Sequence, residues 1–294
     1  MNNIVVGIGE ILWDIFPERK VLGGAPANFA YHISQFGYNG YAVSAIGDDL
    51  LGKEIMTMLA DKKLNYLIEK TDFPTGTVEV TLDKRGIPQY KIYDNVAWDN
   101  IPFSARTENL AKNTKAVSFG SLAQRHPVSH ATIKKFLSLM PKDSIRIFDI
   151  NLRQNFYSKE IIHDSLELAT ILKINDEEII TVSELYGWKG VNEQDVCIKL
   201  LKQYDLDVVI LTKGTAGSFV FNRKETSYQP TPKMHIADTV GAGDSFTAGF
   251  IAAYMQGERI TDAHHLAVEV SAYVCTQHGA MPVLPDAYRE LFRK

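Results

Sequence analysis

A run of small residues beside an aspartate is the clearest sign of chemistry in this sequence. It reads Asp238-Thr239-Val240-Gly241-Ala242-Gly243-Asp244, and a run typical of a helix follows it. Because Gly241, Ala242 and Gly243 lack bulky side chains, their amides can approach an anion, and the positive end of the helix adds attraction. Asp244 could then take a proton from a hydroxyl that attacks a phosphoryl group. The alternative is an aspartate that only caps a helix after a glycine turn.

A second glycine-rich stretch lies near the N-terminus and reads Gly23-Gly24-Ala25-Pro26-Ala27-Asn28. Paired glycines before a helix allow a ligand to approach the backbone closely. The Asn28 amide, in the first helical turn, can both donate to and accept from ligand hydroxyls. Taken alone, this pattern favours a simple turn followed by a helix cap.

Alternating strands and helices must position these residues. Short apolar runs predict strands at 4–8, 41–46, 116–119, 145–150 and 208–211. Periodic apolar residues predict helices at 27–36, 50–59, 129–140, 159–171 and 193–204. Such alternation is typical of an α/β fold with a doubly wound, mostly parallel sheet flanked by helices. Since no repeat or linker divides the chain, we expect residues 1–294 to form a single domain.

The segment 76–94 departs from this alternation. It contains two runs of alternating polar and apolar residues, 77–81 and 89–93, separated by the turn-prone Asp83-Lys84-Arg85-Gly86. Such a hairpin cannot easily join a sheet that is buried on both faces. We therefore interpret it as part of a small β lid, formed by about 10–16 and 75–98, that covers a site. A plain hairpin at the sheet edge is the alternative.

Composition and charge narrow the classes of partner. The net charge is −4 and the pI about 6.1, so no basic field is present to attract nucleic acid or an acidic membrane. Cys197 and Cys275 are too few for a disulfide framework. The N-terminus lacks the basic stretch of a signal peptide, and no apolar run is long enough to span a membrane. These features predict a cytoplasmic protein with small-molecule ligands.

Together, the two glycine-rich stretches resemble the two signatures of the ribokinase-like (PfkB) carbohydrate kinase family, and the resemblance covers the whole chain. It implies a ribokinase-like fold and an ATP-dependent transferase that phosphorylates a sugar hydroxyl. Asp244 would be the general base, and Gly241 to Gly243 would form the anion hole. The implied cofactors are ATP and Mg²⁺. Some members of the family are homodimers that associate through the lid, so the resemblance also implies such a dimer.

Further segments resemble the family's substrate and metal segments. Residues 149–153 read Asp-Ile-Asn-Leu-Arg, which implies that Asn151 and Arg153 line the sugar and phosphate region. Residues 175–178 form an Asn-x-x-Glu pattern. The resemblance implies that Asn175 contacts the nucleotide phosphates and that Glu178 holds Mg²⁺ through water, which suits the tendency of this ion to keep several waters.

Two other segments resemble the family's nucleotide-binding parts. The run 211–218 resembles the ATP loop, which implies that Thr212, Gly214 and Gly217 contact the nucleotide. The run 275–280 resembles the segment that flanks adenine, so His278 is expected beside the base, with a surface position at a helix end as the alternative. The resemblance also implies a monovalent cation, K⁺, bound by main-chain carbonyls of four residues: Asp238, Val240, Val274 and Gly279.

The identity of the phosphoryl acceptor is the part of the function that the sequence determines least. The run from Gly9 to Pro17 looks like the start of bacterial fructokinases, where an aspartate at the position of Asp14 binds sugar hydroxyls. Gly23, Gly24 and Asn28 would complete that sugar site, and fructose is the expected acceptor. Arg85 and Arg125 are the only obvious extra cations for a phosphosugar. A 2-keto-3-deoxygluconate kinase is the nearest alternative, and a catalytically inactive sugar or nucleotide sensor is the alternative from another class.

Overall fold

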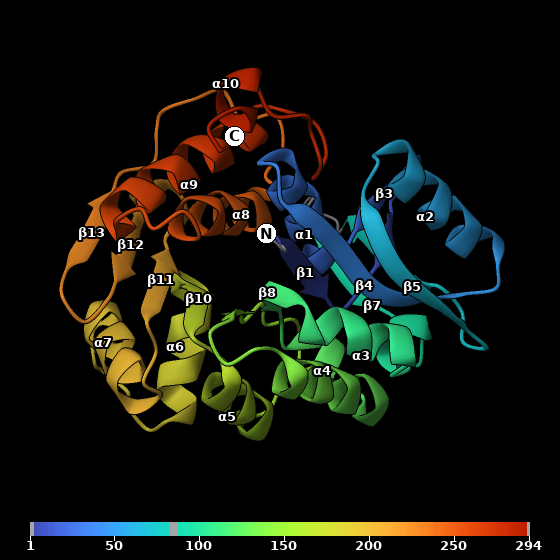
Figure 1. Cartoon of the computed structure of the whole chain (residues 1–294), viewed down its shortest axis with the longest axis horizontal. Helices are drawn as coiled ribbons and strands as arrows, with labels where there is room; N and C mark the ends of the chain where they lie inside the picture. Colours follow the sequence, from blue (N-terminus) through green and yellow to red (C-terminus); the bar gives the residue numbers. More distant parts are fainter. Residues whose placement is uncertain (1–2, 83–87, 293–294) are drawn as a thin grey trace.

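The structure is a computed structural model that describes residues 3–82 and 88–292. A nine-stranded sheet forms its centre (Figure 1). Its strand order is β13-β12-β11-β10-β9-β8-β1-β4-β5. The strands are β1 (Ile4–Ile8), β4 (Asn39–Gly47), β5 (Asn65–Thr71), β8 (Thr114–Phe119), β9 (Ile145–Asp149), β10 (Ile171–Asn175), β11 (Val208–Thr212), β12 (Ser218–Phe221) and β13 (Thr226–Gln229). Neighbours pair in parallel except β11 with β12 and β12 with β13. The predicted doubly wound, mostly parallel sheet is confirmed.

Helices cover both faces of this sheet. One face carries α1 (Ala25–Gln35), α8 (Ala242–Tyr254) and α9 (Ile260–Cys275). The other carries α3 (Ala105–Lys112), α4 (Pro127–Leu139), α5 (Lys159–Leu168), α6 (Asp176–Leu185) and α7 (Glu193–Gln203), while α2 (Leu50–Asp61) and α10 (Asp286–Arg289) lie at the periphery (Figure 1). The predicted helix 159–171 ends at Leu168, because Ile171 already pairs in β10. In the described part of the chain, every helix is too short or too polar to cross a bilayer.

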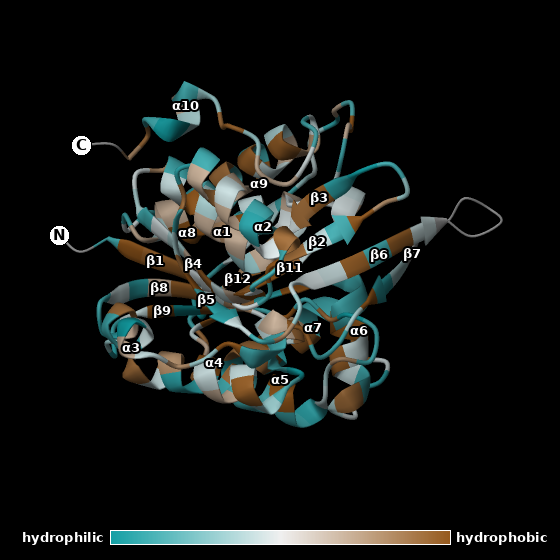
Figure 2. Ribbon diagram, turned by 90° about the vertical axis from the view of Figure 1, so that its right-hand side faces the viewer, coloured by the Kyte–Doolittle hydropathy of each residue, from teal (hydrophilic) through white to brown (hydrophobic). Residues whose placement is uncertain are grey.

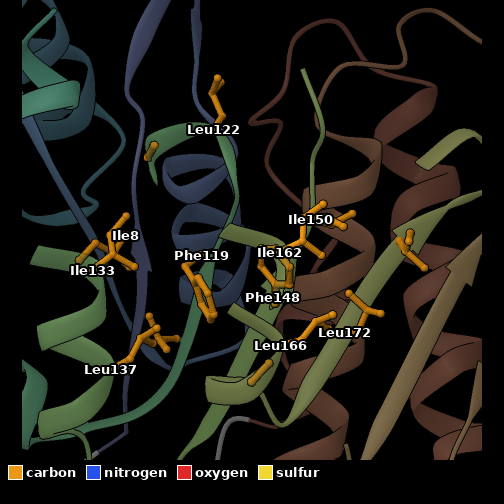
Figure 3. Packing of buried hydrophobic residues seen from close by; sticks show 14 of the residues in the cluster. Ile8, Phe119, Leu122, Ile133, Leu137, Phe148, Ile150, Ile162, Leu166 and Leu172 are labelled. Atoms are coloured by element: carbon orange, nitrogen blue, oxygen red, sulfur yellow. The ribbon is translucent and has the colours of Figure 1, made fainter. Parts of the chain in front are cut away.

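Aromatic packing between β8 and β9 holds the middle of the sheet rigid. Phe119 and Phe148 stack with their ring centroids 5.3 Å apart, and both are buried. Figure 3 shows them against apolar side chains of α4 and α5, among them Ile133 and Ile162. Since full burial of one such side chain stabilises a fold by about 1.5–3 kcal/mol, this cluster fixes the carboxyl ends of β8 and β9.

A separate four-stranded sheet lies on one side of the molecule (Figure 2). Its order is β3 (Lys20–Gly23), β2 (Leu12–Ile15), β6 (Gly76–Leu82) and β7 (Pro88–Ile92). The segments at 10–16 and 75–98 supply β2, β6 and β7 as predicted, whereas β3 was not predicted. The pairing of β2 with β6 is parallel, and the other two pairings are antiparallel. The turn 83–86, which includes Arg85, lies outside the described residues.

A buried ion pair fastens the small sheet to the main one. Arg125 donates from Nε to Asp99 Oδ1 at 2.7 Å and from Nη2 to Asp99 Oδ2 at 2.8 Å. The same Nη2 donates to the Tyr93 carbonyl at 2.6 Å, just beyond β7. The guanidinium also lies 4.2 Å from the centre of the Trp98 ring. Because the pair is bidentate and buried, it holds the base of the small sheet in one position.

Candidate active site

The carboxyl ends of the central strands define the candidate site. After β1 the chain continues to β4 on one side, while β8 takes the place on the other side of β1. In open α/β sheets, ligands bind in the crevice that such a reversal of strand order creates. The small sheet begins directly after β1, so it starts beside this reversal of strand order.

One hydrogen bond joins the two glycine-rich motifs. Asn28 Nδ2 donates to Asp244 Oδ2 at 2.7 Å, although the residues lie 216 positions apart. The bond forms because α1 packs along α8. Asn28 is buried, and its Oδ1 atom finds no partner among the described residues. A buried acceptor without a partner is uncommon in proteins, so this oxygen is available to a ligand hydroxyl.

The backbone at Gly241 requires a glycine. This residue is the N-cap of α8, with φ at +78° in the left-handed region. A Cβ atom added there would lie 2.6 Å from the carbonyl oxygen of Ala280. The tight turn directs the chain into α8, whose positive N-terminal end is suited to an anion. Ala242 and Gly243 form the first residues of that helix.

A buried lysine that sequence reasoning missed lies behind this helix end. Lys173, on β10, donates from Nζ to both carboxylate oxygens of Asp149, at 2.9 Å each. A Cβ atom added to Gly243 would lie 3.1 Å from that Nζ atom. The Lys173 ammonium group therefore adds positive charge beside the predicted anion hole. Its signal in the sequence was a single lysine inside the apolar run of β10.

The carboxyl group of Asp244 is tuned by its surroundings. Burial, followed by the negative charge of Asp149, raises its pKa to about 6. The Asn28 hydrogen bond and the charges of Lys173 and Arg153 oppose that rise. At neutral pH the group is thus an ionised carboxylate whose affinity for a proton is much higher than that of an ordinary aspartate, as a general base requires.

Among the residues predicted for the sugar, Arg153 lies within electrostatic range of both Asp14 and Asp244. Asp14 lies on β2, and a Cβ atom added to Gly23 would come within 2.6 Å of its Oδ2 atom. Burial raises the pKa of Asp14 to about 6, and the charge of Arg153 opposes the rise. Gly24 is the N-cap of α1, with φ at +118°. Asn151 follows β9 in the left-handed region, with φ at +45°.

A cavity of about 600 Å³ lies next to the predicted anion hole, where Ala242 and Gly243 form part of its wall. Thr212, Gly214 and Gly217 line it, as does Gly243, so the structure brings these predicted nucleotide residues together. The remaining walls are largely apolar and come from α8, α9 and the segment before them: Met234, Ile236, Phe246, Val268 and Ala272. By contrast, His278 is exposed and is not among the lining residues. Its place beside a base stays a prediction.

The Asn-x-x-Glu pattern forms the start of α6. Asn175 Oδ1 accepts from the N–H groups of Glu177 and Glu178, at 3.0 and 2.8 Å. In return, Glu178 Oε2 accepts from the Asn175 N–H at 2.9 Å, and its Oε1 accepts from the Leu152 N–H at 3.0 Å. Each carboxylate oxygen keeps a second lone pair that could receive a metal-bound water. Residues 3–82 and 88–292 contain no cluster of three side chains suited to direct metal binding.

The segments predicted to hold K⁺ lie against each other. Asp238 accepts from the Val240 N–H through Oδ1 at 3.0 Å and from the Gly279 N–H through Oδ2 at 3.2 Å. The Ala237 N–H donates to the Cys275 carbonyl at 2.9 Å, next to the buried Val274. This loop is therefore fixed beneath α8, and cation binding there stays a prediction.

Comparison with known proteins agrees with this geometry. Residues 16–287 match the model of the pfkB family carbohydrate kinase. An ATP-dependent 6-phosphofructokinase of Thermoanaerobacterium thermosaccharolyticum is 30% identical over 96% of this chain and 91% of its own. The fructokinase of Escherichia coli is 26% identical over 95% of each chain. A fructokinase structure from Xylella fastidiosa with bound ATP has a TM-score of 0.84 at 20% identity, covering 97% of this chain and 96% of that one. Since the family match spans most of the sequence, this protein belongs to the PfkB family of carbohydrate kinases.

Proposed function

We propose that this protein transfers the terminal phosphoryl group of Mg²⁺-ATP to a hydroxyl of fructose. The observation that carries the proposal is the Asn28–Asp244 hydrogen bond. It sets an unpartnered amide oxygen and a carboxylate of raised pKa side by side. They lie at the N-terminus of α8, between the predicted sugar residues and the cavity lined by the predicted nucleotide residues.

In the proposed reaction, Asn28 Oδ1 and Asp14 orient the acceptor hydroxyl. Asp244 removes its proton as the new O–P bond forms and the bond between the β and γ phosphates breaks, which releases ADP. The backbone from Gly241 to Gly243 and the Lys173 ammonium stabilise the negative charge of the phosphoryl group during transfer. Mg²⁺ would neutralise phosphate charge, and Glu178 would hold it through water.

The charges on the acceptor side favour a neutral sugar. Glu10, Asp14 and Asp244 contribute carboxyl groups there, and Arg125 is already paired with Asp99. Among the described residues near the proposed sugar site, Arg153 remains as a cation that could pair with an acidic acceptor. A phosphorylated or acidic acceptor would meet repulsion from the carboxylates. The relatives named fructokinase support the same acceptor.

A panel of acceptors with Mg²⁺-ATP in a coupled assay tests the proposal. We expect the highest kcat/KM with fructose, and much lower values with ribose and adenosine. Fructose 6-phosphate is an essential member of the panel because of the 6-phosphofructokinase relative. Faster turnover of fructose 6-phosphate or of 2-keto-3-deoxygluconate would overturn the acceptor and leave the kinase activity standing. Turnover of none of these compounds would favour an inactive sensor.

Substituting Asp14 should weaken sugar binding and leave ATP binding unchanged. D14A removes a half-buried carboxyl group from the proposed sugar site, so we expect kcat/KM for fructose to fall roughly 10- to 100-fold through a higher KM. The KM for ATP should not change. Steady-state kinetics with each substrate varied in turn measure both values, with D48A, at an exposed carboxylate paired with Lys70, as the control. Equal losses for both substrates would contradict a sugar-specific role.

The rate should fall in acid around pH 6. The raised pKa of Asp244 means that the base is ionised above about 6 and protonated below it. kcat/KM should therefore decrease tenfold per pH unit well below 6. Asp14 titrates in the same range, so the profile is also measured for D14N, which should keep this limb. A limb near pH 4 would show that the Asp244 environment differs from the one described.

Two expectations from the family resemblance complete the proposal. K⁺ would bind through the carbonyls of Asp238, Val240, Val274 and Gly279 and would order the loop before α8. A homodimer would form through the small sheet. Tyr90 on β7 is 57% exposed and provides apolar surface for such an interface.

A further inference from the structure

A buried carboxyl group without an assigned role lies within electrostatic range of Asp244 and Arg153. Glu10 follows β1 after Gly9 and is only 3% exposed. Its own carbonyl oxygen would lie 2.5 Å from a Cβ atom added to Gly24, so its backbone is pressed against the start of α1. Glutamate is rarely buried in proteins unless it is paired. Glu10 therefore requires an explanation beyond packing.

One oxygen of this carboxyl group is left without a partner. Glu10 Oε2 is fully buried, and no hydrogen-bonding group of the described residues reaches it. The N–H groups of Glu10 itself and of Ala25 favour the charged form of the carboxyl group. Asn28 Oδ1, one turn further along α1, is a second buried acceptor without a partner. Two such acceptors at the start of one helix match a ligand that brings several hydroxyl donors, since leaving each unsatisfied costs about 1–3 kcal/mol.

Charges place Glu10 within electrostatic range of the catalytic group. Burial raises the pKa of Glu10 to about 7, the charge of Asp244 on α8 adds to the rise, and the charge of Arg153 after β9 opposes it. From the other side, Asp244 also faces Asp149 on β9, Lys173 on β10 and Asn28 on α1. Because the pKa of Glu10 is the higher of the two, Glu10 has largely lost its charge at the pH where Asp244 titrates.

We propose that Glu10 is a substrate-binding residue whose Oε2 atom accepts a hydrogen bond from a hydroxyl of the sugar acceptor. This inference rests on the proposed sugar kinase function and adds a residue to it. The hydroxyl that Glu10 binds differs from the one that is phosphorylated, because Asp244 and Asn28 serve the latter.

The test compares E10Q and E10L with the unmodified protein, using the sugar that the acceptor panel selects. E10Q keeps the shape and one oxygen but loses the charge, and E10L removes all hydrogen bonding. We expect the sugar KM to rise roughly 10- to 100-fold in E10L and less in E10Q, with an unchanged KM for ATP. In E10Q the acid limb of kcat/KM should stay near pH 6, because Glu10 has the higher pKa and is already protonated where Asp244 titrates.

The control is E69Q, which neutralises a carboxylate on β5 that pairs with Arg106 away from the crevice. It should leave both KM values and the pH profile unchanged. If E10Q and E10L keep the sugar KM of the unmodified protein, the inference is wrong although the kinase function stands. A parallel rise of both KM values with a lower Tm would instead make Glu10 a structural residue. Absence of turnover in the unmodified protein would overturn the proposed function itself.

Discussion

Replacing Asp244 by asparagine should lower kcat by about 10²- to 10⁴-fold while the protein stays folded and binds ATP. Asparagine retains a side-chain oxygen that can accept the hydrogen bond from Asn28 Nδ2, so the packing of α1 against α8 is preserved. What it cannot do is receive the proton of the acceptor hydroxyl. The coupled assay gives kcat, and isothermal titration with ATP gives the affinity.

A surface aspartate on the neighbouring helix provides the matched control for this experiment. Asp262 on α9 pairs with Arg259 at the surface, so D262N should retain normal turnover. Near-native kcat in D244N would remove Asp244 from its proposed role. Loss of ATP binding in D244N would show that the aspartate supports the nucleotide site instead.

Replacing Lys173 by methionine should reduce the free energy of unfolding by about 3–5 kcal/mol, because it leaves Asp149 buried without its counter-ion. The Lys173 and Asp149 side chains are only 10% and 9% exposed. Asp244 also lies within range of the lysine charge, so the loss affects more than one carboxylate. Urea unfolding followed by circular dichroism measures the change. The exposed pair Lys134–Asp164 offers the control, since K134M should cost less than about 1 kcal/mol.

A double substitution separates stability from catalysis at the same place. In K173M/D149N neither charge is buried alone, so we expect the free energy of unfolding to recover most of its loss. Turnover should remain low, because the ammonium beside Gly243 is still missing. If the double variant regained normal kcat, Lys173 would serve the fold alone.

The sequence predicted five of the nine strands of the main sheet, because these carry strong local signals, and it missed β5, β10, β12 and β13. Continuous apolar runs such as Ile4–Ile8 are typical of parallel strands buried on both faces, and they paired as expected. The strand β3 was missed because Lys20–Gly23 has only four residues and begins at an exposed lysine. What makes it a strand is its pairing with β2, which is a tertiary interaction.

The candidate site was predictable only where chemistry is written into consecutive residues. Gly241 to Asp244 form such a motif, and Asn28 belongs to another. Neither motif indicates that Asn28 and Asp244 are in contact. That contact depends on the packing of α1 against α8, since the two residues lie 216 positions apart. Lys173 and Glu10 were missed because their importance comes from burial. In the sequence each is an isolated charged residue of a kind that usually lies at the surface.

The central position of β1 has a consequence for synthesis of the protein on the ribosome. Ile4 pairs with Asn39 of β4 on one side and with Thr114 of β8 on the other. The second neighbour emerges about 110 residues later, which at common translation speeds takes roughly 5–20 s. During that interval the nascent chain carries an apolar strand with one open edge, a template for association with other chains. Binding of a chaperone to the nascent chain during this interval would favour correct folding. The candidate site can form only after β8 has been synthesised.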